Sequence, residues 1–88
     1  MTKLEREMID WGRRLFERRL ISGWGGNLSC RIDKNQFLIT GQHAALGFLS
    51  AKDLVRIDET GKPVKKNQRA SSETPMHMAI YAGTDAVA

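Results

Sequence analysis

The sequence predicts a mixed α/β fold that contains two helices and three strands. Apolar residues recur at helical spacing in the first twenty residues, and three short apolar-rich segments follow at residues 28–32, 36–40 and 54–58. Serines and a proline at residues 71–75 signal the start of a second helix. With 88 residues, the chain can form one small domain at most.

The first helix is predicted from Lys3 to about Leu20. Its apolar stripe consists of Leu4, Met8, Trp11 and Leu15, widened by Ile9, Phe16 and Leu20. Thr2 followed by Glu5 fits a capping box, and Ser22-Gly23 supplies a flexible exit. Because Trp11 lies on the apolar stripe, we expect it in the core.

The next segments predict a hairpin and a third strand. Residues 28–32 and 36–40 are predicted to be strands joined by the three turn-forming residues Asp33-Lys34-Asn35. Residues 41–49 are predicted to be a loop and residues 50–53 a short capped turn. The third strand is expected at residues 54–58.

The second helix is predicted to start within Ser71-Ser72-Glu73-Thr74-Pro75, to continue to Ala82 and to end at Gly83. Residues 85–88 have the composition of a strand opening. We therefore expect residues 1–88 to be the N-terminal part of a single domain whose remaining elements are not in this sequence.

Composition argues against several classes of protein. The chain is 41% apolar and 27% charged, which is typical of folded domains rather than disordered ones. Its net charge of +4 invites a nucleic-acid interpretation, but the arginines of the first helix alternate with acidic residues, so we expect no nucleic-acid partner. We also expect no membrane insertion, because no apolar stretch is long enough. The single cysteine, Cys30, excludes a disulfide framework and favours the cytoplasm.

Three segments carry residues that can bind an anion or move a proton. Gly25-Gly26-Asn27 can bring backbone N–H groups and an amide close to a phosphate, although a plain tight turn explains it equally well. Ser71 and Ser72 at a helix start offer hydroxyls and unpaired N–H groups, and ordinary capping is the alternative. Glu73 could act as a general acid/base or be a first-turn acid that the helix dipole favours.

The sequence shows no complete metal site. His43, His77 and Cys30 lack the spacings of known zinc motifs. His77 follows Glu73 by one turn, and we expect it to be a packing or hydrogen-bonding helix residue.

The order of these motifs resembles the class II aldolase/adducin family over essentially the whole chain. The most specific pieces are Gly26-Asn27-Leu28-Ser29 and Ser71-Ser72-Glu73, followed by Met76-His77 and Ile80-Tyr81. In the fuculose-phosphate aldolase branch, the resemblance implies that Gly26, Asn27, Ser71 and Ser72 bind the substrate phosphate. It also implies that Glu73 is the catalytic acid/base and a possible additional zinc ligand.

One loop departs from the family pattern. The family usually has a Thr-Gly or Ser-Gly pair where this sequence has Gln42 and His43. Either Gln42 and His43 contact the phosphate here, or Thr40-Gly41 supplies the pair in a shifted register.

The resemblance also implies a three-layer α/β/α fold with a mostly antiparallel central sheet, present here as its N-terminal part. It implies a zinc-dependent lyase that cleaves a ketose 1-phosphate, such as L-fuculose 1-phosphate, to dihydroxyacetone phosphate and an aldehyde. The zinc-binding histidines are expected beyond Ala88, so the chain alone should be inactive. Family members assemble as homotetramers. Related epimerases and dehydratases and non-catalytic adducin-like domains remain alternatives, although Ser72 with Glu73 looks most like the aldolases.

Overall fold

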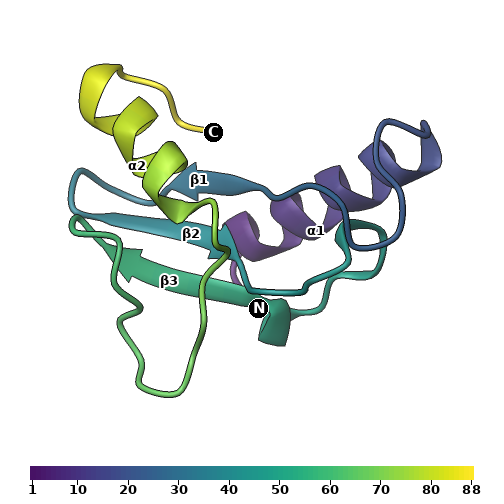
Figure 1. The fold of residues 1–88 in the computed structure, drawn as a ribbon, viewed down its shortest axis with the longest axis horizontal. Helices are drawn as coiled ribbons and strands as arrows, with labels where there is room; N and C mark the ends of the chain where they lie inside the picture. The colour runs from purple at the N-terminus through teal and green to yellow at the C-terminus, as the bar shows by residue number, and fades with distance from the viewer.

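The computed structural model describes residues 1–88 as a three-stranded antiparallel sheet with one helix on each face (Figure 1). The strands are β1 (Ser29–Arg31), β2 (Gln36–Thr40) and β3 (Leu54–Asp58), in the order β1-β2-β3. The helices are α1 (Lys3–Glu17) and α2 (Thr74–Gly83). Two short 3-10 helices, η1 (Leu46–Phe48) and η2 (Ala51–Asp53), lie in the connection between β2 and β3.

Two separate apolar clusters hold the layers together. On the α1 side, the buried residues are Met8, Cys30, Leu38, Leu46, Leu49 and Leu54. On the α2 side, they are Phe37, Ile39, Val55, Ile57 and Tyr81. Side chains alternate between the two clusters along β2, as the period of two in a strand requires. The α/β/α layering expected from the resemblance is therefore confirmed.

The hairpin and the third strand follow the predictions closely. β2 and β3 have the predicted bounds, and Ser29↔Ile39 and Phe37↔Ile57 are cross-strand partners. The Asp33 carboxylate accepts hydrogen bonds from the backbone N–H groups of Asn35 and Gln36, which closes the turn. The capping box of Ser50 and Asp53 is also present, before η2.

Four details differ from the predictions. α1 ends at Glu17 rather than near Leu20, because Arg19 adopts a positive φ of 60°. β1 spans only Ser29–Arg31 rather than residues 28–32. Residues 46–48, predicted to be loop, form η1. Residues 85–88 do not form a strand, because only one backbone hydrogen bond, from Arg31 N–H to the Val87 carbonyl, joins them to β1.

Trp11 is not in the core. Its side chain is 56% exposed, and the Arg14 guanidinium lies 5.2 Å from its ring centre. Met8 is the residue of the predicted stripe that α1 buries fully, together with Gly12, which allows close contact with η1. Neither helix combines the length and apolar character that crossing a bilayer requires.

Candidate functional site

A cleft of about 240 Å³ opens where three loops meet at one edge of the sheet. The loops precede β1, follow β2 and precede α2. The antiparallel pairing of β1 with β2 brings the first two together, and a hydrogen bond from Ser71 N–H to the Thr40 carbonyl (3.0 Å) ties the third to the end of β2. All seven residues singled out from the sequence line this cleft: Gly26, Asn27, Gln42, His43, Ser71, Ser72 and Glu73.

Gly26 shapes the first wall of the cleft. Its φ of +86° lies in the left-handed region, which favours glycine. A Cβ at this position would also lie 3.0 Å from Ile21 and 3.1 Å from Leu46. The glycine therefore allows the chain to pass close to the core and to turn Asn27 toward the cleft.

The loop after β2 contributes Gly41, Gln42 and His43 to the cleft, and not the Thr40 side chain. Thr40 is 1% exposed, and its hydroxyl oxygen accepts a hydrogen bond from Leu28 N–H at 3.1 Å. That bond holds the hydroxyl on the β1 side. His43 has a φ of 66°, a conformation that histidine adopts more readily than most residues. Gln42 and His43 therefore line the cleft together with Gly41 of the alternative pair, whereas Thr40 does not.

Ser71 and Ser72 form a turn before α2 rather than its first helical residues. The Ser71 hydroxyl accepts a hydrogen bond from Glu73 N–H, and its carbonyl accepts from Thr74 N–H. Pro75 has no N–H, and Met76 and His77 donate to the Glu73 carbonyl. Of the unpaired N–H groups predicted at this helix start, only that of Ser72 lacks an acceptor, and the Ser71 hydroxyl makes the local bond that the capping alternative predicted.

Five backbone N–H groups in the cleft have no acceptor within the chain. They belong to Trp24, Gly26, Asn27, His43 and Ser72. The hydroxyl of Ser72 and the amide of Gln42 lie beside them, and no lysine or arginine lines the cleft. Backbone N–H groups gathered in one concave site can bind an anion through hydrogen bonds.

Glu73 brings the only carboxylate to the cleft. It occupies the position just before the first helical residue, where its side chain makes no capping hydrogen bond and no ion pair. The side chain is exposed, so its oxygens are accessible from the cleft. Among the cleft residues, Glu73 and His43 are the ones with ionisable side chains.

His77 lies behind the cleft and contacts Asn27. Its Nε2 is hydrogen bonded to the Asn27 side-chain oxygen, and its Nδ1 lies 2.6 Å from the Ser29 hydroxyl. Burial lowers the pKa of His77 below its usual value, and the nearby Glu73 carboxylate opposes this only in part. The expectation of a hydrogen-bonding helix residue is confirmed.

Trp24 and Ala44 also line the cleft, although their sequence motifs did not predict this, and Gly41 of the alternative Thr40-Gly41 pair lines it as well. The glycine-rich run around Trp24 predicted a turn, but it did not predict that Trp24 would line the cleft. Gly41 follows a strand directly, and Ala70 forms an isolated bridge with it. Only the folded chain reveals that contact.

The residues present do not by themselves fit a zinc site. Nowhere in the chain do three or more histidine, cysteine, aspartate or glutamate side chains gather to hold a metal ion. A catalytic zinc ion takes three protein ligands. Glu73 could supply one oxygen ligand, which is not enough. The histidine ligands that the resemblance implies are not gathered around it.

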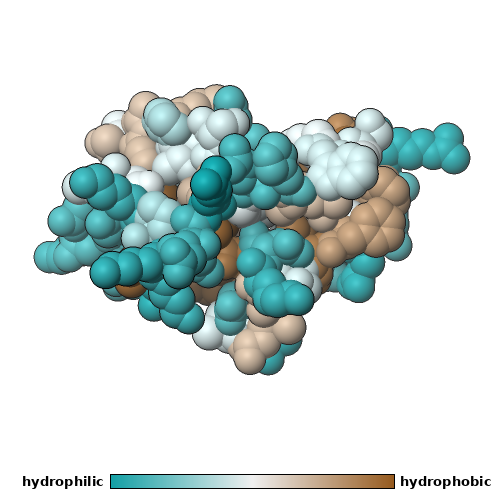
Figure 2. Space-filling view, turned by 60° about the horizontal axis from the view of Figure 1, so that its bottom comes forward, coloured by the Kyte–Doolittle hydropathy of each residue, from teal (hydrophilic) through white to brown (hydrophobic).

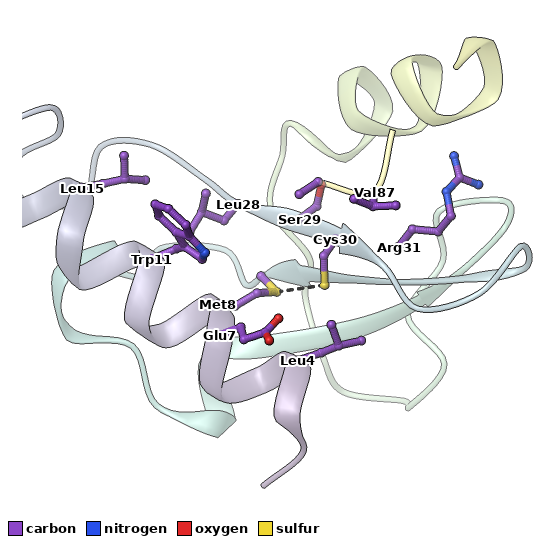
Figure 3. Close-up of a pocket in the computed structure, with 11 residues that line it drawn as sticks. Leu4, Glu7, Met8, Trp11, Leu15, Leu28, Ser29, Cys30, Arg31 and Val87 are labelled. Atoms are coloured by element: carbon purple, nitrogen blue, oxygen red, sulfur yellow. Dashed lines mark hydrogen bonds between the residues drawn. The ribbon is translucent and has the colours of Figure 1, made fainter. Parts of the chain in front are cut away.

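A second cavity is apolar and lies elsewhere. It has a volume of about 320 Å³ and lies between α1 and β1, with Leu4, Met8, Trp11 and Leu28 among its lining residues. Figure 3 shows Cys30 of β1 pointing toward Met8 of α1, and their sulfur atoms are 3.6 Å apart. Burial raises the pKa of the Cys30 thiol, which keeps it protonated. This groove offers few groups for binding an anion.

Comparison with known proteins agrees with the geometry of the cleft. The family model described as "Class II Aldolase and Adducin N-terminal domain" matches residues 6–88. A methylthioribulose-1-phosphate dehydratase from Gluconobacter oxydans is 35% identical over 82 residues, which cover 93% of this chain and 39% of the relative. An L-fuculose phosphate aldolase from Methanococcus maripaludis is 38% identical over 73 residues, covering 83% of this chain and 39% of the relative.

Solved structures agree with these relatives. An L-fuculose 1-phosphate aldolase superimposes with a TM-score of 0.84 at 31% identity, over 97% of this chain and 41% of that chain. The L-fuculose-1-phosphate aldolase of Thermus thermophilus gives a TM-score of 0.80 at 31% identity, over 96% of this chain and 43% of that chain. The chain thus spans about two fifths of the length of these relatives. Because the family model matches nearly all of its residues, the chain belongs to the class II aldolase and adducin family.

Proposed function

We propose that this chain supplies the phosphate-binding and proton-transferring part of an active site that cleaves a phosphorylated ketose. The observation that carries the proposal is the meeting of Asn27, His43, Ser72 and Glu73 around one cleft from three separate loops. Free hydrogen-bond donors and a free carboxylate in the same cleft suit a substrate that has both a phosphate and a reacting carbon.

The phosphate would be held by neutral donors. The N–H groups of Gly26, Asn27, His43 and Ser72, which lack acceptors in the chain, would point at its oxygens. The side chains of Asn27, Gln42, Ser71 and Ser72 would add further contacts. Since no lysine or arginine takes part, recognition would depend on geometry more than on net charge.

Glu73 would move the proton. In aldol cleavage, the carbon–carbon bond breaks as the neighbouring hydroxyl loses its proton and becomes the aldehyde carbonyl. The other half is left as an enediolate, which needs one proton on carbon before the product is complete. The Glu73 carboxyl group can deliver that proton, and in the reverse direction the carboxylate can remove it. Its lack of any hydrogen-bonded partner in the chain is what this role requires.

The substrate we favour is L-fuculose 1-phosphate, giving dihydroxyacetone phosphate and an aldehyde. Relatives named as L-fuculose phosphate aldolases support it, together with the pairing of Ser72 and Glu73. The second candidate is dehydration of methylthioribulose 1-phosphate, supported by relatives that are named as methylthioribulose-1-phosphate dehydratases. A purely structural, adducin-like role would not explain the unpaired Glu73 carboxylate in the cleft.

The proposal includes three expectations from the family: a zinc ion, a homotetramer and a cytoplasmic location. Zinc would polarise the substrate carbonyl, and its histidine ligands would have to come from outside residues 1–88. We therefore expect residues 1–88 alone to bind the sugar phosphate but to show negligible cleavage, even with added zinc.

Equilibrium binding tests the proposal directly. The chain should bind L-fuculose 1-phosphate, and unphosphorylated L-fuculose should bind far more weakly. Ser72→Ala should weaken binding of the phosphorylated sugar roughly tenfold, the usual effect of one lost oriented hydrogen bond. Glu73→Gln should bind at least as tightly as the unmodified chain, because it removes a negative charge beside the phosphate.

Two results would reject the proposal. One is equal affinity for the phosphorylated and unphosphorylated sugars, which would show that the phosphate is not recognised. The other is binding that Ser72→Ala leaves unchanged, which would place the ligand outside this cleft. Tighter binding of methylthioribulose 1-phosphate than of L-fuculose 1-phosphate would instead select the dehydratase candidate.

A further inference from the structure

Four side chains form a continuous hydrogen-bonded line from the core to the cleft. The Tyr81 hydroxyl lies 2.7 Å from the Ser29 hydroxyl, which lies 2.6 Å from His77 Nδ1. His77 Nε2 then contacts the Asn27 side-chain oxygen. Asn27 is the member that lines the cleft, and the other three lie behind it.

The chemistry of the groups gives this line a single direction. An amide oxygen can only accept, so His77 Nε2 must carry the proton and donate to Asn27. In a neutral imidazole Nδ1 is then an acceptor, so the Ser29 hydroxyl donates to it. Ser29 in turn accepts from the Tyr81 hydroxyl. Every group in the line is satisfied, and no buried side-chain nitrogen or oxygen lacks a partner.

The spacing in the sequence explains why the four residues meet. His77 and Tyr81 are four residues apart on α2 and so lie on one face of the helix. Ser29 begins β1 and Asn27 precedes it by two residues, a spacing that places both side chains on the same side of the chain when the backbone is extended. The pair from the helix and the pair from the β1 segment therefore interleave.

The inner end of the line is firmly held. Tyr81 is 6% exposed and its ring lies 4.7 Å from that of Phe37. The Arg31 guanidinium lies 5.1 Å from the Tyr81 ring and donates to the Tyr81 carbonyl at 3.1 Å. Ser29 is 7% exposed. Because Tyr81 is held in place, the hydrogen bonds through Ser29 and His77 restrict the position of the Asn27 side chain.

We infer that His77 is a positioning residue that fixes the Asn27 amide with its oxygen turned away from the cleft and its NH₂ group turned into it. An asparagine amide can present either its oxygen or its NH₂ group, and only the NH₂ group attracts an anion. The imidazole selects the anion-binding orientation. This inference rests on the proposed phosphate-binding function for its purpose, but the orientation itself can be measured separately.

The tautomer of His77 is the first test. Long-range ¹H–¹⁵N correlation spectra of the chain at neutral pH should show the Nε2–H tautomer for His77. The exposed imidazole of His43 provides an internal comparison in the same spectrum. An Nδ1–H tautomer would reverse every bond in the line, present the Asn27 oxygen to the cleft, and overturn the inference.

Two substitutions at His77 form the second test. His77→Gln keeps a donor for Asn27 and an acceptor for Ser29, whereas His77→Leu keeps neither. Inorganic phosphate should bind His77→Gln within about twofold of the unmodified chain, and His77→Leu roughly tenfold more weakly. Equal phosphate affinity in all three proteins would overturn the inference, since a purely structural contact would not separate glutamine from leucine by anion affinity.

The two tests separate this inference from the proposed function. If the unmodified chain does not bind phosphate, the proposed function fails, while the His77 tautomer still decides the orientation of Asn27. If His77→Leu does not fold, the tautomer and the His77→Gln variant still decide the result. Phosphate binding with an Nδ1–H tautomer would keep the proposed function and reject the positioning role.

Discussion

Whether a hydrogen-bonding group is available to a ligand in the cleft depends on the bonds that it makes within the chain. The Thr40 hydroxyl is drawn out of the cleft by Leu28 N–H, while the N–H group of His43 remains without an acceptor. The sequence could not decide between Thr40-Gly41 and Gln42-His43, because that choice depends on a cross-strand bond. Asn27, Ser71, Ser72 and Glu73 were predictable as candidates, since short motifs carry their chemistry.

The lowered pKa of His77 predicts a stability change with pH. The unfolded chain takes up a proton at His77 near the ordinary pKa of 6.5, whereas burial makes the folded chain resist it. The free energy of unfolding should therefore fall as the pH falls through about 6.5 and level off below the lowered pKa of the folded state. Urea unfolding at a series of pH values measures this.

His77→Gln is the matched control for that series, because glutamine does not titrate. Its free energy of unfolding should depend less on pH between about 7.5 and 5.5 than that of the unmodified chain. The carboxylates with lowered pKa, Glu5 and Asp58, titrate at more acidic pH and leave this window clear. Identical pH dependence in the two proteins would contradict the account of His77.

At the scale of elements, the end of α1 shows why its length was overestimated. Leu20 N–H donates to the Leu15 carbonyl and Arg19 N–H to the Phe16 carbonyl, the pattern of a Schellman motif. Arg19 occupies the left-handed position that is usually glycine. The sequence placed the exit at Ser22-Gly23 because arginine does not normally signal a helix end.

Arg19→Gly should therefore stabilise the protein. Glycine adopts the left-handed conformation without the steric cost that arginine carries, and the net gain should be about 0.5–1 kcal/mol after the added freedom of the unfolded chain is counted. Thermal or urea unfolding measures the change. A loss of stability would show that the Arg19 side chain contributes more than its backbone conformation costs.

The contact between α1 and η1 depends on Gly12. A Cβ at Gly12 would lie 2.3 Å from the Leu46 carbonyl oxygen, so Gly12→Ala must push the two elements apart. We expect a loss of at least about 2 kcal/mol in the free energy of unfolding. Gly83→Ala is the control, because no atom lies within 4 Å of its added Cβ. It should be neutral or slightly stabilising, and equal effects of the two substitutions would contradict this packing.

The helices and strands were largely predictable from the sequence, whereas the burial of Trp11 and the structure of residues 85–88 were not. The short apolar-rich segments at residues 36–40 and 54–58 predicted the correct bounds of β2 and β3. The same reasoning placed Trp11 in the core, because a helical stripe shows which residues share a face but not how far the covering elements reach. It also made a strand of residues 85–88, which a single backbone bond to β1 does not sustain.

At the scale of the whole molecule, the chain combines a polar cleft with considerable exposed apolar surface. Trp11, Trp24, Phe48 and Val87 are all more than half exposed. Figure 2 shows hydrophobic residues reaching the surface between hydrophilic ones on the face in view. The apolar groove between α1 and β1 lies apart from the cleft, and Asn27 and the other cleft residues do not line it. Because the two sites share no lining residues, the residues that a ligand affects show whether it binds in the cleft or in the groove.

Backbone NMR during titration with L-fuculose 1-phosphate tests the central claim most directly. The account predicts that the largest amide shifts occur at Gly26, Asn27, His43 and Ser72, whose N–H groups have no acceptor in the chain. Unphosphorylated L-fuculose should leave these four signals nearly unchanged. Shifts confined to the groove between α1 and β1, or no shifts at millimolar ligand, would contradict the claim that this cleft binds a sugar phosphate.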